Sequence, residues 1–245
     1  MKSKPQVGHL ISLKEEIFIN NLKEVKKAFD NYKVNIILDG GTLLGAYRDK
    51  KFIEWDDDID FVMWMKDLDK AKLACKELKG YHIDINTGNY CPDINLYKDG
   101  CPIGISLYTD IQGNVIRKRI EPRHFIGQSL NYLHWVLNLY DAKSKKGRTS
   151  PEITEKIVEL CQLIPNGIRE KLVKIVWSIY EKIDTTHIEH IIPSHFFINL
   201  SELEFYGMKF KVPKDTEGYL KFRYGDNWKT PIKSERCYLM GDMTQ

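Results

Sequence analysis

Four carboxylates lie within five residues of this chain, at Asp56, Asp57, Asp58 and Asp60, with only Ile59 between the third and the fourth. Carboxylates this close repel one another, so either some of them are protonated or a cation lies among them. Residues two apart in a strand point to the same face, so Asp58 and Asp60 would present their carboxylates together. Such oxygen ligands suit Mg²⁺ or Mn²⁺, with coordination positions left open for substrate phosphates. The spacing therefore predicts a divalent metal site that neutralises phosphate charge and orients an in-line displacement.

A glycine pair precedes the acids and could bind the phosphates themselves. Gly40 and Gly41 end an apolar stretch, and glycine lets a backbone approach a phosphate closely. Thr42 opens a short predicted helix whose first amides face the turn, and Arg48 after that helix could add a charge to the same phosphates. The alternative is an exposed acidic turn that happens to contain glycines. Together and in this order, the two features favour phosphotransfer.

The surrounding pattern predicts elements that would hold these residues in place. Residues 12–32 read as an amphipathic helix with Ser12 as its N-cap. Further predicted elements are strands at 34–39, 59–63, 81–85, 93–97 and 102–108, and helices at 42–47, 66–78, 125–140, 151–163 and 165–183. We therefore expect an α/β half over residues 1–121 and a mainly helical half over residues 122–245, packed as one functional unit.

Composition narrows the possible functions. The net charge of +3 over 245 residues is too small to indicate nucleic acid as a partner. The five cysteines show no C-x-x-C spacing, which suits a reducing compartment better than a disulfide framework. The first residues lack an apolar core of signal-peptide length, and no stretch approaches the roughly 20 apolar residues of a membrane span. We expect a soluble, cytoplasmic protein without a membrane span.

Two blocks of the sequence resemble a known family. The run GGTLLGAYRDKKFIEWDDDIDF, residues 40–61, resembles the signature of the LicD family, the phosphocholine transferases related to fukutin and fukutin-related protein. The run LEFYGMKFKVPKDTEGYLKFRYGDNWKTP, residues 203–231, resembles the family's C-terminal block, with an apolar strand pair, a V-P-x-D turn and a Y-G pair before a final Pro. The resemblance covers about residues 36–231, although the middle matches only in pattern.

The resemblance implies a fold and a reaction. It implies a nucleotidyltransferase-type mixed sheet flanked by helices. It places Mg²⁺ on Asp58 and Asp60 with Asp56 as a supporting acid, and it assigns donor phosphate to Gly40, Gly41 and Thr42. The implied reaction moves a phospho-alcohol group, such as phosphocholine or ribitol phosphate, from a CDP-activated donor to a glycan hydroxyl and releases CMP. One carboxylate would accept the proton of that hydroxyl.

One departure from the family pattern concerns the third acid, which the family carries on a later strand. Ser106 stands at that position here. Asp110 lies four residues further on, about 13 Å away by strand rise, so it needs a bulge or turn to reach the site. Asp93 and Asp84 are the other candidates, on neighbouring strands. Without a third acid, two alternatives remain: a catalytically silent member that binds a nucleotide or glycan, and a small-molecule nucleotidyltransferase.

Three other features have more ordinary interpretations. His187, His190 and His195 could include a His-x-x-His zinc pair on a helix, but packing or surface roles are favoured. The basic run at 117–119 could meet a phosphorylated ligand, although a solvated hairpin edge is favoured. A choline headgroup calls for an aromatic box, and the best candidates by position are Trp55, Tyr97, Tyr108, Tyr224 and Trp228.

Overall fold

The computed structural model describes residues 12–88, 92–122, 124–137, 156–157, 159–161, 163–183 and 185–233. The first elements along the chain are α1 (Leu13–Asn31), β1 (Ile37–Leu38), α2 (Gly40–Leu44), the π-helix η1 (Gly45–Asp49), β2 (Ile59–Trp64), the 3₁₀ helix η2 (Met65–Asp67), α3 (Leu68–Glu77), β3 (His82–Asn86), β4 (Asp93–Lys98) and β5 (Cys101–Tyr108). The later ones are β6 (Asp110–Ile111), β7 (Asn114–Pro122), α4 (Phe125–Leu137), α6 (Asn166–Tyr180), β8 (Thr185–Pro193), α7 (His195–Ile198), β9 (Leu200–Phe205), β10 (Met208–Pro213) and α8 (Thr216–Tyr224).

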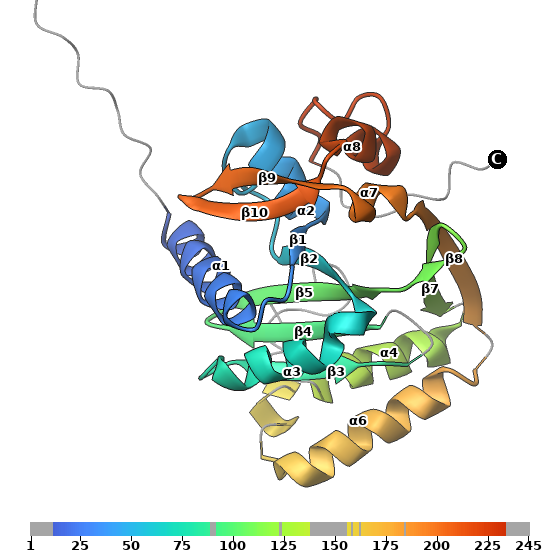
Figure 1. The fold of residues 1–245 in the computed structure, drawn as a ribbon. Helices are drawn as coiled ribbons and strands as arrows, with labels where there is room; N and C mark the ends of the chain where they lie inside the picture. The colour runs from blue at the N-terminus through green and yellow to red at the C-terminus, as the bar shows by residue number, and fades with distance from the viewer. Residues whose placement is uncertain are drawn as a thin grey trace, which may run out of the picture.

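A seven-stranded mixed sheet forms the centre of the protein, in the order β3-β4-β5-β2-β1-β10-β9 (Figure 1). Strand β2 runs parallel to β5 and antiparallel to β1, and β1 runs parallel to β10. Helix α1 packs against α3 and β5, and α4 packs against α6. A smaller sheet, β6-β7-β8, lies beside the end of β5 (Figure 1). The predicted α/β fold with a mixed sheet flanked by helices is therefore confirmed.

The C-terminal half is less helical than predicted. It supplies β8 to the small sheet and supplies β9 and β10 to the large one, next to β1. The resemblance had implied the β9–β10 pair, whereas no pattern had indicated β8. The two halves thus contribute to one sheet, while the boundary at residue 121 stays a prediction.

Several predicted elements agree closely with the structure. Ser12 caps α1, and its hydroxyl accepts a hydrogen bond from the amide of Glu15 at 3.1 Å. Helix α2 begins at Gly40, two residues earlier than predicted, and Asp39 occupies its N-cap position. The predicted helix over 151–163 lies largely outside the described residues.

His187 and His190 lie in strand β8, and His195 begins α7, so the interpretation as a His-x-x-His pair on a helix is wrong. Residues three apart in a strand point to opposite faces. His190 lies opposite Arg117 of β7 in the small sheet.

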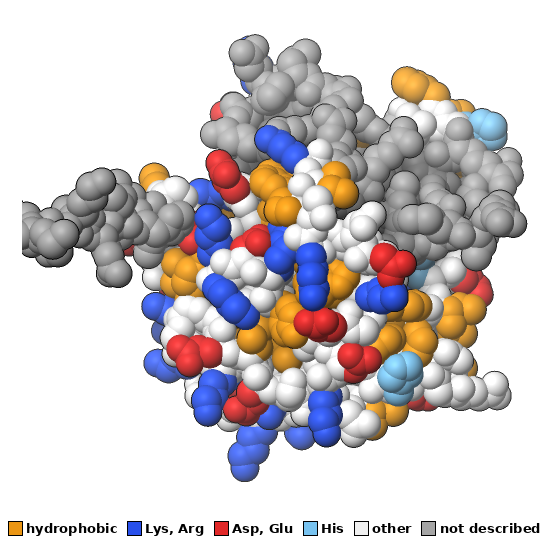
Figure 2. All heavy atoms as spheres, turned by 90° about the horizontal axis from the view of Figure 1, so that it is seen from above, with side chains coloured by type: hydrophobic (Ala, Val, Ile, Leu, Met, Phe, Trp, Pro, Cys, Tyr) orange, Lys and Arg blue, Asp and Glu red, His pale blue; other side chains and the backbone are white. Residues whose placement is uncertain are grey.

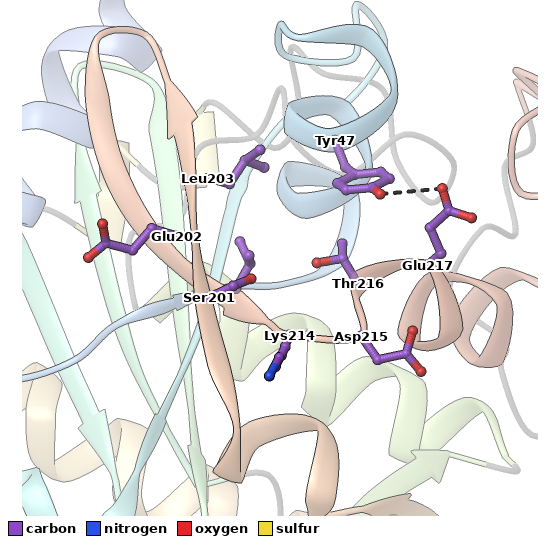
Figure 3. A pocket seen from close by; sticks show the side chains of 9 residues that line it. Tyr47, Ser201, Glu202, Leu203, Lys214, Asp215, Thr216 and Glu217 are labelled. Carbon is purple, nitrogen blue, oxygen red and sulfur yellow. Dashed lines mark hydrogen bonds between the residues drawn. The ribbon is translucent and has the colours of Figure 1, made fainter.

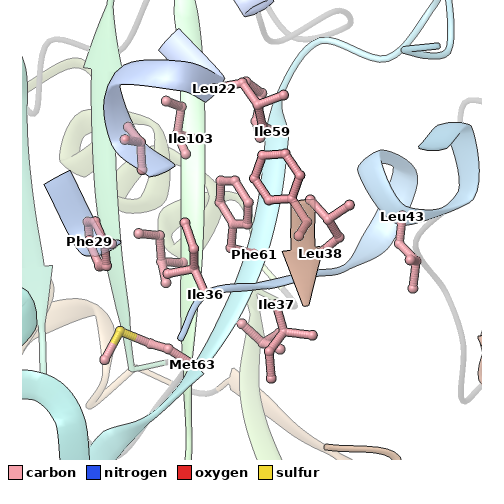
Figure 4. Packing of buried hydrophobic residues seen from close by; sticks show 14 of the residues in the cluster. Leu22, Phe29, Ile36, Ile37, Leu38, Leu43, Ile59, Phe61, Met63 and Ile103 are labelled. Carbon is pink, nitrogen blue, oxygen red and sulfur yellow. The ribbon is translucent and has the colours of Figure 1, made fainter. Parts of the chain in front are cut away.

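The two faces of the large sheet differ in character. Ile59, Phe61 and Met63 alternate along β2 and lie in one buried cluster with Leu22 and Phe29 of α1 (Figure 4). The intervening positions point to the other face, which is polar. Strand register puts the following residues side by side on that polar face: Asp60, Gly104 and Asn95 in one row, and Val62, Ser106 and Asp93 in the next.

The described surface has no single charge character on the face seen from above. Acidic, basic and apolar side chains are interspersed among the described residues of that face (Figure 2). No helix in the described part of the chain combines the length and the apolar character needed to cross a membrane. The described cysteines Cys75, Cys101 and Cys161 are buried and free.

Candidate functional site

The acid cluster, defined as Asp56, Asp57, Asp58 and Asp60, lies where the chain enters β2. Carboxylate oxygens of its first three members lie within 4.8 Å of one another. Asp58 Oδ1 is buried and has no hydrogen-bond partner among the described residues. A buried carboxylate oxygen without a partner is costly, so this atom is suited to a ligand. Asp60 is adjacent to that group rather than within it, whereas exposed Asp57 is one of its three members.

The negative charges of the acid cluster are poorly compensated by their surroundings. Burial raises the pKa of Asp58, and the charges of Asp60, Asp56 and Asp57 raise it further. Burial also raises the pKa of Asp60, as do the charges of Asp39 and Asp56. A divalent cation would relieve both the burial and the repulsion, because it stabilises the ionised form of each acid. The donor set consists of hard oxygen atoms and fits Mg²⁺ or Mn²⁺.

The glycine pair makes room for the carboxylates. A Cβ on Gly41 would lie 2.0 Å from Asp56 Oδ2, and a Cβ on Gly40 would lie 2.2 Å from Asp60 Oδ2. Gly40 also has a φ of +55°, which disfavours any other residue. The two glycines therefore let α2 lie directly against two acids of the cluster, a role that the sequence pattern did not reveal.

Backbone and hydroxyl contacts fix α2 to β2. The amide of Asp60 donates to the Thr42 hydroxyl at 2.9 Å, and the amide of Asp39 donates to the carbonyl of Asp60 at 3.1 Å. Thr42 is buried. Its hydroxyl oxygen thus accepts a structural hydrogen bond, and its predicted contact with donor phosphate stays a prediction.

Arg48 is engaged elsewhere. Its Nε and Nη2 donate to the two carboxylate oxygens of Asp49 at 2.8 and 2.7 Å, and its Nη1 donates to the carbonyl of Trp228 at 3.3 Å. Each nitrogen of the guanidinium therefore already has a partner, and the geometry favours a structural link to the C-terminal block over phosphate binding.

The candidates for the third acid occupy different places. Asp93 of β4 pairs directly with Ser106 and lies on the polar face. Burial raises its pKa to about 7. Asp110 is exposed at the start of β6, where it accepts a hydrogen bond from the amide of Gly113 in the following turn at 2.9 Å. Hydrogen bonds to Ser194 and Gly113 lower the pKa of Asp110. Asp84 of β3 lies one strand beyond Asp93, opposite Asn95.

Three residues at the site were missed by the sequence reasoning. Asp39 is buried, accepts a hydrogen bond from the Tyr219 hydroxyl, and has a carboxylate oxygen 3.9 Å from Arg223 Nη2. Tyr219 and Arg223 belong to α8 and therefore to the second family block. The second family block does contain polar residues in a helix, which is a sign of a contact elsewhere in the protein. The sequence alone did not show that the partner of this helix is Asp39.

Two hollows of the described structure lie away from the acid cluster or at its edge. One, of about 300 Å³, is the acidic pocket between η1, β9, β10 and the start of α8 (Figure 3). Its three acids all have partners: Glu202 binds Lys211 at 3.0 Å, Asp215 accepts from the amide of Gly218 at 3.0 Å, and Glu217 accepts from the Tyr47 hydroxyl at 3.3 Å. A second hollow of about 300 Å³ lies between α1 and residues 51–56 and touches the acid cluster at Asp56.

Two of the aromatic candidates are held in packing contacts. The ring of Tyr108 lies 5.0 Å from that of Phe197, and the ring of Trp228 lies 5.9 Å from that of Tyr47. Trp55 is 39% exposed beside the acid cluster.

Comparison with known proteins finds a match in the part of the chain that carries the acid cluster. Residues 33–91 match the family model described as LicD/FKTN/FKRP, nucleotidyltransferase domain. The lipopolysaccharide cholinephosphotransferase LicD of Haemophilus influenzae is 44% identical over 55 residues, which make up 22% of this chain and 21% of that relative. The match thus spans about a fifth of the length of that curated relative. The resemblance of the acid-bearing block to the LicD family is confirmed over this stretch, whereas residues 203–231 lie outside it.

Two solved structures align over most of the chain. A crystal structure of ANT(2″)-Ia in complex with adenylyl-2″-tobramycin aligns with a TM-score of 0.33 and 12% identity, covering 67% of this chain and 99% of that one. A solution structure of the antibiotic-resistance factor ANT(2″)-Ia aligns with a TM-score of 0.34 and 13% identity, covering 69% of this chain and 96% of that one.

Proposed function

We propose that this protein transfers a phospho-alcohol group, of the phosphocholine type, from a CDP-activated donor to a hydroxyl of a glycan. The observation that carries the proposal is the acid cluster, with its buried, unpartnered Asp58 Oδ1, inside the block that matches the LicD family. The relative from Haemophilus influenzae is named for cholinephosphate transfer to lipopolysaccharide, which supports both the phospho-alcohol and the glycan acceptor.

Mg²⁺ or Mn²⁺ would be held by Asp58 and Asp60, with Asp56 in support. When bound, the metal would neutralise phosphate charge and hold the donor for in-line displacement. The chain's own part begins with Gly40 and Gly41, which keep α2 close enough for its first amides to face the donor phosphates.

In the reaction, the acceptor oxygen forms a bond to the phosphorus of the phospho-alcohol group, and the bond from that phosphorus to the CMP oxygen breaks. The acceptor's proton passes to a base, and CMP leaves. Asp93 is better supported as this base than Asp110, because Asp93 lies on the polar face beside Ser106. Its pKa of about 7 leaves it partly deprotonated at neutral pH, as a general base requires.

A catalytically silent, nucleotide- or glycan-binding protein is the second candidate. The observation that favours it is Ser106, which stands on the polar face where the family pattern carries an acid. By strand geometry, Asp93 and Asp60 are two strands and two residues apart, or roughly 12 Å between Cα atoms. The first candidate thus requires a substrate that spans this distance.

Thermal unfolding and product release together test these candidates. We expect CDP-choline or CDP-ribitol with Mg²⁺ or Mn²⁺ to raise the melting temperature more than either component alone, and we expect CMP release once a glycan acceptor is added. Metal-supported nucleotide binding without CMP release over many acceptors would instead favour the silent protein. Release of pyrophosphate from CTP would favour a small-molecule nucleotidyltransferase.

A further inference from the structure

Two arginines from distant parts of the chain converge on the acid cluster. Arg117 extends from β7 of the small sheet, and Arg223 extends from α8. Arg117 lies over the ring of Tyr108, which shares a face of β5 with Gly104, the residue that pairs with Asp60. Arg223 Nη2 lies 3.9 Å from a carboxylate oxygen of Asp39, whose amide donates to the carbonyl of Asp60. Both arginines therefore lie on the polar side of the sheet that carries Asp60.

An aromatic wall, formed by Tyr108, Phe197 and Tyr219, lies against the two arginines. The Arg117 guanidinium lies over the ring of Tyr108 at 5.9 Å, and the Arg223 guanidinium lies over the ring of Tyr219 at 6.0 Å. Phe197 packs edge-on against both rings, at 5.0 Å from Tyr108 and 5.2 Å from Tyr219. The wall is buried, so it holds the positions of the two guanidinium groups firmly.

Arg223 retains hydrogen-bonding capacity that the fold does not use. Its Nη2 faces Asp39 at 3.9 Å, which is an ion-pair distance rather than a hydrogen bond. Its Nε is buried and has no hydrogen-bond partner among the described residues. A buried N–H donor normally has an acceptor, so this atom indicates a ligand with acceptor oxygens.

We propose that Arg117 and Arg223 form the receptor for the diphosphate of the donor, on the polar side of the sheet that also carries Asp60. This inference rests on the proposed function for the identity of the donor. Guanidinium groups suit phosphate because their planar forks donate two parallel hydrogen bonds to its oxygens. The pair also takes the role that the sequence assigned to Arg48, whose nitrogens bind Asp49 and Trp228 instead.

The test uses inorganic pyrophosphate and Mn²⁺ as separate probes, each titrated calorimetrically against the full chain. Arg117→Gln and Arg223→Lys should weaken the binding of pyrophosphate, measured with Mg²⁺ present, by about ten- to hundredfold. The same variants should bind Mn²⁺ at least as tightly as the unmodified protein, because removing or moving a positive charge favours a cation at the acids. Lys209→Gln removes one positive charge from an exposed side chain of β10, which pairs with Glu202 and not with the acid cluster, and should change neither titration.

Unchanged pyrophosphate binding in both variants would overturn the inference. A parallel loss of pyrophosphate and Mn²⁺ binding would also overturn it, because the arginines would then support the fold rather than the phosphates. Arg117→Lys adds a further criterion. Its ammonium group keeps the positive charge but cannot donate two parallel hydrogen bonds, so its affinity for pyrophosphate should lie between those of Arg117→Gln and the unmodified protein. If no CDP-alcohol yields CMP but pyrophosphate binding still depends on both arginines, the proposed reaction fails and the phosphate receptor stands.

Discussion

The acid cluster and the acidic pocket both place several carboxylates around one spot, but they differ in how those carboxylates are satisfied. In the acidic pocket, Glu202 and Glu217 have basic or hydroxyl partners and Asp215 caps a helix. In the acid cluster, Asp58 has an oxygen with no partner among the described residues, and burial raises the pKa values of Asp58 and Asp60. The difference teaches that unsatisfied charge, rather than the size of a hollow, marks the candidate site in this protein.

Neutralising the acid cluster gives the largest expected effect. Asp58→Asn and Asp60→Asn should each lower CMP release by about a thousandfold or more, because each removes a metal-binding charge. The metal-free variants should also melt at a higher temperature than the unmodified protein, since a buried repulsion is relieved. Glu202→Gln in the acidic pocket is the matched control and should change CMP release less than twofold. If Glu202→Gln lowered CMP release as much as the acid-cluster variants do, the proposed difference between the two regions would be contradicted.

The dependence of stability on pH should differ between the two regions. Burial raises the folded-state pKa of Asp93 from 3.8 to about 7, so the folded protein holds a proton that the unfolded chain has released between these values. Stability of the metal-free protein should therefore fall as pH rises from about 4 to about 7, by at most about 4 kcal/mol for this group. Asp58 and Asp60, whose pKa values are also raised, act in the same direction.

Glu202 of the acidic pocket should make stability change with pH in the opposite direction. Its hydrogen bond with Lys211 lowers its pKa, so its stabilisation is present at neutral pH and is lost on acidification. Unfolding in denaturant at a series of pH values checks both signs. Saturating Mn²⁺ should reverse the slope above pH 5, because metal binding strengthens as the acids lose protons. A metal-free stability that rises steadily from pH 4 to pH 7 would contradict the assignment of poorly compensated acids.

Two glycines allow the same substitution to be compared in each region. Gly41→Ala would place a Cβ 2.0 Å from Asp56 Oδ2, and Gly218→Ala would place one 2.1 Å from Asp215 Oδ2. The first should weaken Mn²⁺ binding by about tenfold, because Asp56 supports the metal ligands, and should cost about 1–3 kcal/mol of stability. The second should cost about 1 kcal/mol through the cap of α8 and leave Mn²⁺ binding unchanged. Calorimetry and denaturant unfolding measure the two effects, and a loss of Mn²⁺ binding in Gly218→Ala would show that the regions are coupled.

Much of the region around the acid cluster could be predicted from local pattern. The N-cap at Ser12 and strand β2 follow from side-chain spacing, which depends on neighbours in sequence. The glycine pair could be recognised in the sequence, but its structural role could not. The close approach of Gly40 to Asp60 depends on how α2 folds back onto β2. The sequence also suggested Arg48 as a phosphate ligand, and only the fold shows that its guanidinium binds the distant Trp228 carbonyl as well as the neighbouring Asp49.

The residues that could not be predicted belong to long-range contacts. Asp39 and Tyr219 are 180 residues apart, and they meet because β10 pairs with β1 and carries α8 to the sheet. Strand β8 was missed because polar residues and a final proline obscure its apolar pattern. Its pairing with β7, which the sequence does not show, holds it in the extended conformation. The sequence placed Ser106 in a strand, as the structure does, but only the register of β4 shows that Asp93 is its neighbour.

The smallest predicted effect compares two tyrosines that each donate to a carboxylate. Tyr219→Phe removes a buried hydrogen bond to Asp39, which leaves that acid with Arg223 at 3.9 Å, and should cost about 1–3 kcal/mol. Tyr47→Phe removes a 3.3 Å hydrogen bond to exposed Glu217 in the acidic pocket and should cost less than about 0.5 kcal/mol. The burial of the acceptor decides the difference, because water replaces the lost donor at Glu217 but cannot easily reach Asp39. Denaturant midpoints measure both, and equal costs would mean that Asp39 is solvated and that the link from α8 to the acid cluster is weaker than its geometry indicates.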